Sequence, residues 1–163
     1  MKFPRTIRMD LSDENVFAKA ADPGEWAVTG SFAFADLNPD LIKGKTAQAF
    51  RNGWLGLGSF GFSTLVQVAT MEAQDWDAVV GALSSHFVEV YGAPSLEAAR
   101  PVAEAEAAYA RDLCDHPSGT LLAIRREMTL EGISEKIHVI DQAEDSLHHG
   151  SRVWELVPDD APA

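Results

Sequence analysis

Cysteine occurs once in this 163-residue chain, at Cys114. A disulfide bond within the chain is therefore excluded, and such sparing use of cysteine is typical of a reducing compartment. Long hydrophobic runs are also missing, because no apolar stretch reaches the roughly 18 residues of a membrane-spanning helix. The first ten residues, MKFPRTIRMD, lack the apolar core of a signal peptide. These absences predict a cytoplasmic protein that has no association with membranes.

Positive charge is scarce as well. The chain has 13 Lys and Arg residues against 25 Asp and Glu residues, which gives a net charge of −12 and a pI near 4.7. Nucleic-acid binding is driven mainly by cations that neutralise phosphates, so this balance excludes nucleic acid as the expected partner. The acidity favours solubility and, if a protein partner exists, one with a basic surface.

Hydrophobic periodicity indicates which segments form strands and which form helices. Apolar alternation predicts strands at 3–9, 26–36, 60–70, 120–129, 133–141 and 152–157, and three-to-four spacing predicts helices at 39–54, 73–91 and 95–114. The segment 11–25 is expected to be an irregular connection that ends in a Pro-Gly turn, and Pro101 is expected to separate a first short turn from its helix.

The order of these elements lacks the sustained β-α-β alternation of parallel sheets. It predicts an α+β fold, with a mostly antiparallel sheet and about three helices packed on one face. Neither an internal repeat nor a linker interrupts the chain, so residues 1–157 are expected to form a single domain and residues 158–163 a disordered tail.

The stretch GLGSFG, Gly56 to Gly61, matches the G-x-G-x-x-G pattern of dinucleotide-binding loops. That function requires a strand before the glycines and a helix that opens after them, so that free N–H groups meet the phosphates. The sequence predicts the reverse order, with a helix before the loop and a strand after it. We therefore expect a structural turn, in which Gly53 caps the helix in the left-handed conformation.

Histidines near the C-terminal end offer the only candidate metal ligands, His138, His148 and His149. Their spacing is a weak match, because adjacent histidines on a strand point to opposite sides. A solvated acidic loop is the alternative interpretation, and no cofactor is predicted.

Cys114 and His116 lie two residues apart at a predicted helix end, beside Asp112 and Asp115. A Cys–His pair can act as nucleophile and base, but neighbouring carboxylates and a helix C-terminus raise a thiol pKa. We therefore expect a structural cysteine. His86 is expected to be a packed residue with a satisfied hydrogen bond, and Glu104 and Glu106 to form a solvated acidic surface with the two aspartates. No catalytic residues are predicted.

Large aromatic residues are concentrated in the first half of the chain, at Trp26, Phe32, Phe34, Phe50, Trp54, Phe60, Phe62, Trp76 and Phe87. That half is expected to hold the main core, and one or two of these side chains are candidates for a pocket or a docking surface.

The stretches KFPRTIRMDLSDENVF, PGEWAVTGSFAF, FRNGWLGLGSFGFSTLV and HFVEVYGAPSLEAARPVAEAE carry a family resemblance. In these, the chain resembles a family of small proteobacterial proteins with a domain of unknown function. The resemblance covers about the first 115 residues and continues more loosely beyond them. It implies a loose association with the assembly of redox enzymes, and it brings no catalytic residues.

The sequence thus leads to the hypothesis of a non-catalytic accessory or assembly protein that acts through protein–protein contacts. One alternative is a small-molecule-binding protein or an enzyme with a pocket between sheet and helices. Another is a metal-binding protein that uses the histidines in 138–149. A homo-oligomer is compatible with all three.

Overall fold

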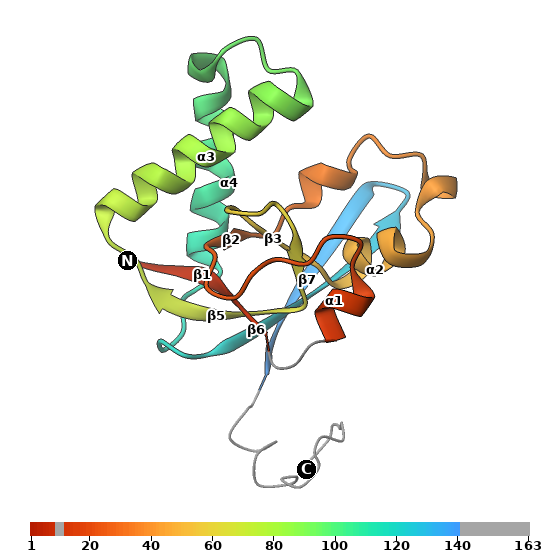
Figure 1. Cartoon of the computed structure of the whole chain (residues 1–163), viewed down its shortest axis with the longest axis horizontal. Coiled ribbons are helices and arrows are strands. Elements are labelled where there is room, and N and C mark those ends of the chain that lie inside the picture. The colour runs from red at the N-terminus through yellow and green to blue at the C-terminus, as the bar shows by residue number, and fades with distance from the viewer. Residues whose placement is uncertain (9–11, 141–163) are drawn as a thin grey trace, which may run out of the picture.

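The structure is a computed structural model that describes residues 1–8 and 12–140 (Figure 1). The elements are, in chain order, β1 (Lys2–Ile7), α1 (Ser12–Val16), β2 (Ala27–Val28), the 3₁₀ helices η1 (Ser31–Phe34) and η2 (Pro39–Leu41), α2 (Gly44–Asn52), β3 (Trp54–Gly56), β4 (Phe62–Ser63), β5 (Leu65–Thr70), α3 (Ala73–Tyr91), α4 (Leu96–Asp112), β6 (Leu121–Thr129) and β7 (Gly132–Ile140).

All strand pairs within the two sheets are antiparallel. A four-stranded sheet has the order β1-β5-β6-β7, and a three-stranded sheet has the order β2-β3-β4. The α+β class predicted from the sequence is therefore confirmed, although the strands are divided between two sheets. Among the described residues, no helix is long and apolar enough to cross a membrane.

The predicted strand 60–70 is in fact two strands that belong to different sheets. β4 pairs with β3, whereas β5 pairs with β1 and β6. The chain changes sheet at Thr64, whose hydroxyl donates to Asp13 Oδ1 at 2.7 Å, while the neighbouring Ser63 hydroxyl bonds to the carbonyl oxygen of Ile7 at 3.1 Å. Polar side chains thus stabilise the point at which the chain passes from one sheet to the other. The apolar pattern of 60–70 does not reveal this point.

The predicted strand 26–36 is wrong beyond its first residues, because β2 ends at Val28 and η1 follows. Gly30 has a φ of 83°, which turns the chain out of the extended conformation. Phe32 and Phe34 then point in different directions, as residues two apart in a 3₁₀ helix do. Phe32 packs against the core beside α3, and Phe34 packs in a separate cluster with Phe17 and Phe50.

The predicted helix 39–54 is also shorter than expected. Ile42 and Lys43 separate η2 from α2, which begins at Gly44, with a φ of 56°, and ends at Asn52. Gly53 caps α2 with a φ of −92°, so the expected left-handed conformation is wrong. The glycine is required for space, because a β-carbon at Gly53 would lie 2.7 Å from Cδ1 of Phe62 and 2.8 Å from the carbonyl oxygen of Ala49.

Helix α3 has the predicted bounds and forms a helical hairpin with α4. Reciprocal bonds between Glu72 and Asp75 cap its N-terminus, and Gly92, with a φ of 75°, ends it. Ser95 caps α4, which continues through Pro101, so the expected separate turn is wrong. The two helices pack closely because α4 presents only small side chains to the core beside α3, namely Ala99, Ala103, Ala107 and Ala110.

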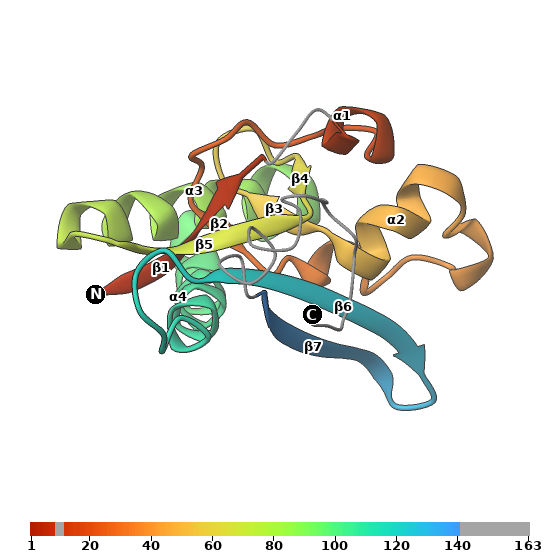
Figure 2. The ribbon, with the colours of Figure 1, turned by 90° about the horizontal axis from the view of Figure 1, so that it is seen from below.

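Strands β6 and β7 form the predicted hairpin, nine residues long on each side. Gly132 follows the turn at Leu130 and Glu131 with a φ of 119°. Figure 2 shows this hairpin extending beneath α2, away from the helical hairpin. The predicted strand 152–157 and the tail 158–163 lie outside the described residues.

Candidate functional site

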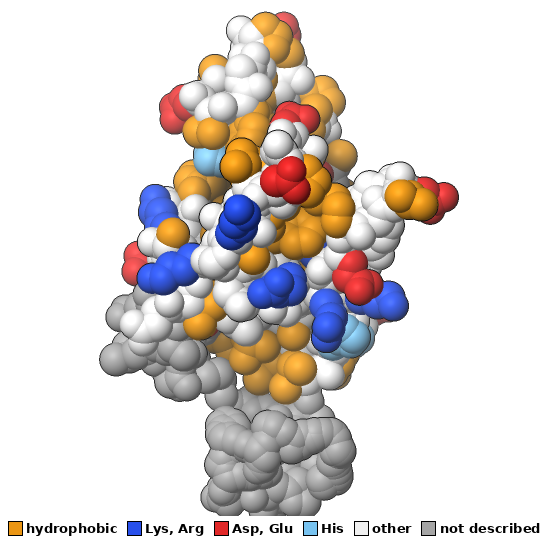
Figure 3. All heavy atoms as spheres, turned by 90° about the vertical axis from the view of Figure 1, so that its right-hand side faces the viewer, with side chains coloured by type: hydrophobic (Ala, Val, Ile, Leu, Met, Phe, Trp, Pro, Cys, Tyr) orange, Lys and Arg blue, Asp and Glu red, His pale blue; other side chains and the backbone are white. Residues whose placement is uncertain are grey.

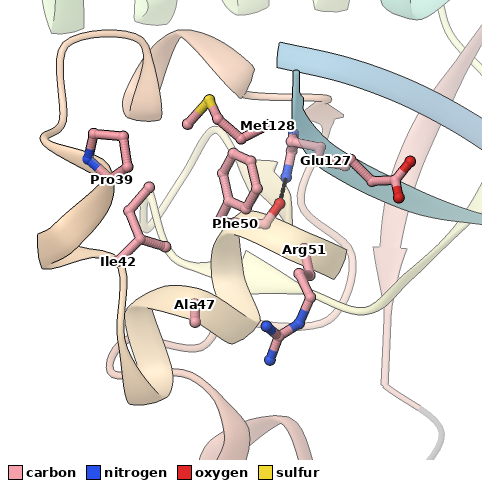
Figure 4. Close-up of a pocket in the computed structure, with 8 residues that line it drawn as sticks. Pro39, Ile42, Ala47, Phe50, Arg51, Glu127 and Met128 are labelled. Carbon is pink, nitrogen blue, oxygen red and sulfur yellow. Dashed lines mark hydrogen bonds between the residues drawn. The ribbon is translucent and has the colours of Figure 1, made fainter. Parts of the chain in front are cut away.

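An apolar groove opens between η2, α2 and β6 (Figure 4). It has a volume of about 310 Å³, and its apolar lining consists of Pro39, Ile42, Ala47, Phe50 and Met128. Figure 4 shows the Phe50 ring between Ile42 and Met128, while the carboxylate of Glu127 points away from them. The side walls of the groove are therefore mainly hydrophobic, Arg51 and Glu127 lie at its margin, and Arg126 lies beneath it.

Side chains alternate between the two faces of β6, and one face contributes residues both to the core and to the groove. Leu122, Ile124 and Arg126 are buried on the same side, and Met128 follows on that side as the strand leaves the core. Nearby apolar side chains are open to water: Leu41 is 67% exposed, Met128 is 41% exposed, and Leu130 at the hairpin turn is fully exposed. These exposed apolar residues make the groove a candidate contact surface.

Arg126 lies beneath this groove and holds its walls together. Its Nη1 donates to the carbonyl oxygens of Ala49 at 3.2 Å and Phe50 at 2.9 Å, at the end of α2. Its Nη2 donates to the carbonyl oxygen of Thr29. A cation at a helix C-terminus satisfies carbonyls that lack intrahelical partners. The guanidinium is wholly buried, so its role is structural.

Glu135 on β7 neutralises this buried cation. Its Oε2 lies 3.2 Å from Nε of Arg126, and the Ser31 hydroxyl, which accepts from the same Nε at 2.6 Å, donates to Oε2. Tyr109 on α4 donates to Oε1 at 3.1 Å. Burial lowers the pKa of Arg126, and the Glu135 carboxylate opposes this effect. The sequence analysis did not single out Arg126; its place on the inward face of β6 is the signal that distinguishes it.

The glycine loop joins β3 to β4 of the small sheet, and no helix opens after it. Its N–H groups nevertheless bind an anion, which is the carboxylate of Glu25. Oε1 accepts from the backbone nitrogens of Gly58 at 2.8 Å and Ser59 at 2.7 Å, and Oε2 accepts from that of Asp22 at 2.7 Å. Burial raises the pKa of Glu25, but these hydrogen bonds outweigh it, so the pKa is lowered overall.

Two of the loop glycines are dictated by space. A β-carbon at Gly56 would lie 2.5 Å from Oε1 of Glu25, and one at Gly61 would lie 2.6 Å from the carbonyl group of Ala20. The glycine motif therefore forms a carboxylate-binding loop, here called the cradle, and the carboxylate that it binds is that of Glu25 in the same chain.

A second hollow lies between α3 and the glycine loop. It has a volume of about 330 Å³ and is lined mostly by apolar side chains, with Glu25 at one side. The lining residues are Gly24, Glu25, Trp26, Leu57, Gly58, Ala78, Val79 and Ala82.

Of the candidate metal ligands, His138 lies within the described residues. His138 is exposed on β7, opposite Ala123, while His148 and His149 lie outside the described residues. Residues 1–8 and 12–140 contain no group of three or more His, Cys, Asp or Glu side chains that could hold a metal ion.

Cys114 is buried, and burial raises the pKa of its thiol to about 12, with Lys2 opposing the shift. The direction agrees with the sequence analysis, but the main cause is burial rather than the neighbouring carboxylates. Within the described residues no hydrogen bond joins Cys114 to His116. At neutral pH the thiol is protonated and inaccessible, which does not suit a nucleophile.

The acidic residues of α4 differ in their surroundings. Glu104 is exposed and lies 3.4 Å from Arg100 as an ion pair, and Asp112 pairs with Arg111 at 3.3 Å. Asp115 is also exposed. Glu106 is half-buried, and burial together with the nearby Glu135 carboxylate raises its pKa.

His86 is half-buried in a cluster of aromatic rings at the end of α3. Its ring stacks on Phe60 with the centroids 3.9 Å apart and the planes 6° from parallel. Burial lowers the pKa of His86. The packed position agrees with the sequence analysis, but its neighbours are rings: Phe32 at 6.4 Å and Tyr91 at 5.4 Å complete the cluster.

Comparison with protein-family models matches residues 1–152 to DUF6505, described as a family of unknown function. The chain belongs to this family. The resemblance seen in the sequence is thereby confirmed as one to a domain of unknown function, and it extends further along the chain than the first 115 residues. No curated protein and no solved structure matches the chain. The function of this DUF6505 member must therefore be argued from its surfaces.

Proposed function

We propose that this chain is a non-catalytic, cytoplasmic accessory or assembly protein that acts by binding another protein. The observation that carries the proposal is the apolar groove between η2, α2 and β6, with exposed Leu41, Met128 and Leu130 beside it. Exposed hydrophobic surface of this kind on a monomer is typical of a protein-docking site.

The shape of the groove favours a protein over a small molecule. Several of its walls, including Pro39, Arg51 and Met128, are themselves exposed to solvent. Small-molecule sites enclose about 70–90% of their ligand, and a hollow with such open walls does not. A protein segment that lies across the groove can cover Phe50 and Met128 together and also contact the rim.

The test is affinity capture from native host cells with matched variants. Leu41→Asp/Met128→Asp places two carboxylates at the groove, and Val102→Asp/Val139→Asp makes the same change at exposed valines on α4 and β7. We expect wild type and the α4/β7 variant to recover one partner in stoichiometric amounts, and the groove variant to lose it. Recovery of the free protein alone, or of the same partner by all three, contradicts the proposal.

The hollow between α3 and the glycine loop supports a second candidate function, the binding of a small apolar molecule. It lies between the small sheet and a helix, with Trp26, Leu57 and Val79 in its lining. A ligand present at about 100 times its Kd adds about 2.7 kcal/mol of stability. A thermal-shift screen with apolar metabolites tests this, and Ala82→Trp, which fills the hollow, should abolish any shift. A flat response across the screen counts against this candidate.

A further inference from the structure

The turn between α3 and α4 lies at the end of the helical hairpin farthest from the sheets (Figure 1), and the residues beside it include exposed apolar ones. Val90 and Tyr91 close α3 and are 60% and 44% exposed, and Leu96 opens α4 and is 57% exposed. None of these side chains belongs to a buried core cluster in the described part of the chain. They face water at the turn of the hairpin.

The aromatic cluster around His86 extends this apolar surface and anchors it. The ring centroid of Tyr91 lies 5.6 Å from that of Phe32 and 5.4 Å from that of His86. We refer to Phe32, Phe60, His86, Val90, Tyr91 and Leu96 together as the tip patch. Stacked rings lose little conformational freedom when a partner binds, which favours affinity.

Charge distinguishes the helical hairpin from the rest of the fold. Between residues 72 and 115 only Arg100 and Arg111 are basic, whereas nine residues are acidic: Glu72, Asp75, Asp77, Glu89, Glu97, Glu104, Glu106, Asp112 and Asp115. Of these, Glu89 and Glu97 lie beside the tip patch, and Glu72, Asp75, Asp77, Asp112 and Asp115 lie at the opposite ends of α3 and α4. Lys19 lies near His86 of the patch. The segment 41–71, by contrast, has three basic residues and no acidic one. In Figure 3 the upper part of the molecule shows hydrophobic and acidic side chains, and the basic side chains on that face lie below it.

We infer that the tip patch is a docking surface for a basic segment of another protein, in which Lys or Arg residues flank apolar ones. Apolar contact is provided by Tyr91 and Leu96, and Glu89 and Glu97 beside them attract cations. The sign of the charge disfavours nucleic acid and anionic membranes. A second copy of this chain is also disfavoured, because symmetric contact would place two acidic hairpins against each other. This surface is separate from the groove, so neither proposal depends on the other.

The probe for this inference is a pair of synthetic amphipathic peptides of about 18 residues with one leucine face. One carries lysine on its polar face and the other carries glutamate. Binding is measured by calorimetry. We expect the lysine peptide to bind and the glutamate peptide not to bind. We also expect the Kd of the lysine peptide to rise severalfold between about 50 and about 300 mM NaCl, because salt screens the attraction.

Two pairs of matched variants separate docking from general attraction to an acidic chain. Tyr91→Ser/Leu96→Ser removes apolar contacts from the tip patch, and Leu37→Ser/Val139→Ser removes two exposed apolar side chains that belong neither to the tip patch nor to the groove. Glu89→Gln/Glu97→Gln and Asp36→Asn/Glu131→Gln remove equal charge at exposed positions on and off the helical hairpin. Both tip variants should raise the Kd of the lysine peptide about fivefold or more above the wild-type value. Both control variants should bind this peptide with a Kd within about twofold of the wild-type value.

Glu89→Gln/Glu97→Gln keeps the test valid if the apolar variant folds poorly, because exposed Gln substitutions on a helix change the stability of the protein little. Equal Kd values in all four variants would show attraction to net charge alone and overturn the inference. Absence of binding to wild type, or equal binding of the glutamate peptide, overturns it as well. Loss of partner capture by the groove variant has no bearing on these outcomes.

Discussion

At the scale of single residues, Arg126 joins several separate parts of the fold. Its guanidinium joins the end of α2, the backbone after β2, and Glu135 on β7. These segments are far apart in sequence, and the groove lies over their junction. A buried charge is tolerated only when its hydrogen bonds and its counter-charge are complete, as they are at this position.

Replacement of Arg126 should therefore be costly. In Arg126→Met the carbonyl groups of Thr29 and Phe50 lose their donor, and Glu135 is left without its counter-charge. We expect the free energy of unfolding to fall by about 3–5 kcal/mol, the usual cost of breaking a buried pair. Arg125→Met, the exposed neighbour on β6, is the control and should change stability by less than about 0.5 kcal/mol. Equal effects of the two substitutions in urea unfolding would refute this role.

Glu25 makes stability depend on pH. Its pKa in the folded protein is lower than its ordinary value of 4.5, so its contribution is present above that value and is lost as the pH falls through the lower folded one. We expect the destabilisation caused by Glu25→Gln to be larger near neutral pH than at about pH 3. Urea unfolding of both proteins at the two pH values measures this. A difference that is independent of pH would show that the carboxylate charge does not matter in the cradle.

Two glycines differ in whether the surrounding structure leaves room for a side chain. Gly53→Val should lower the free energy of unfolding by at least about 1 kcal/mol, because the new side chain overlaps Phe62 and the carbonyl group of Ala49. Gly81→Ala is the matched control: it lies in α3 with no atom near the added carbon, and should raise stability by about 0.5–1 kcal/mol. A neutral Gly53→Val variant would mean that the loop adapts freely.

At the scale of elements, the sequence predicted those segments whose local signals agree. Helix α3 has a three-to-four apolar pattern and a glycine stop, and the β6–β7 hairpin has two long alternating segments around a short turn. Both were located within one or two residues. In these elements the local sequence pattern and the tertiary contacts favour the same secondary structure. The bounds of α3 and of the hairpin could therefore be predicted without knowledge of the rest of the fold.

The errors arose where tertiary contacts override the local pattern. Alternation at 26–36 was read as a strand, although a left-handed Gly30 converts it to a 3₁₀ helix whose two phenylalanines enter different clusters. Helix α1 was missed because five residues give too short a window. The groove could not be predicted at all, since Ile42, Phe50 and Met128 meet only through the packing of η2 and α2 on β6.

At the scale of the whole molecule, the net charge of −12 is unevenly placed. The helical hairpin has nine acidic and two basic residues between 72 and 115, whereas the segment 41–71, which contains α2, has three basic residues and no acidic one. The two proposed docking surfaces therefore differ in electrostatic character, and a partner that spans both must match each of them.

Self-repulsion at this net charge should make stability sensitive to ionic strength. We expect the free energy of unfolding at neutral pH to rise between about 10 and about 150 mM salt, as the Debye length shortens from about 30 to about 8 Å. NaCl and KCl should act alike, because screening depends on ionic strength alone. A decrease with salt would mean that specific attractions such as Arg100–Glu104 outweigh the repulsion.

The position of β7 at the end of the large sheet has a practical consequence for handling the protein. Among the described residues β7 pairs with β6 alone, so one row of its backbone groups is open to another strand. Its sequence KIHVI, residues 136–140, is rich in β-branched residues and carries a single formal charge. Repulsion between molecules disappears near the pI of 4.7. Concentrated samples should therefore dimerise through β7 in that pH range first, and Val139→Lys should weaken this dimer.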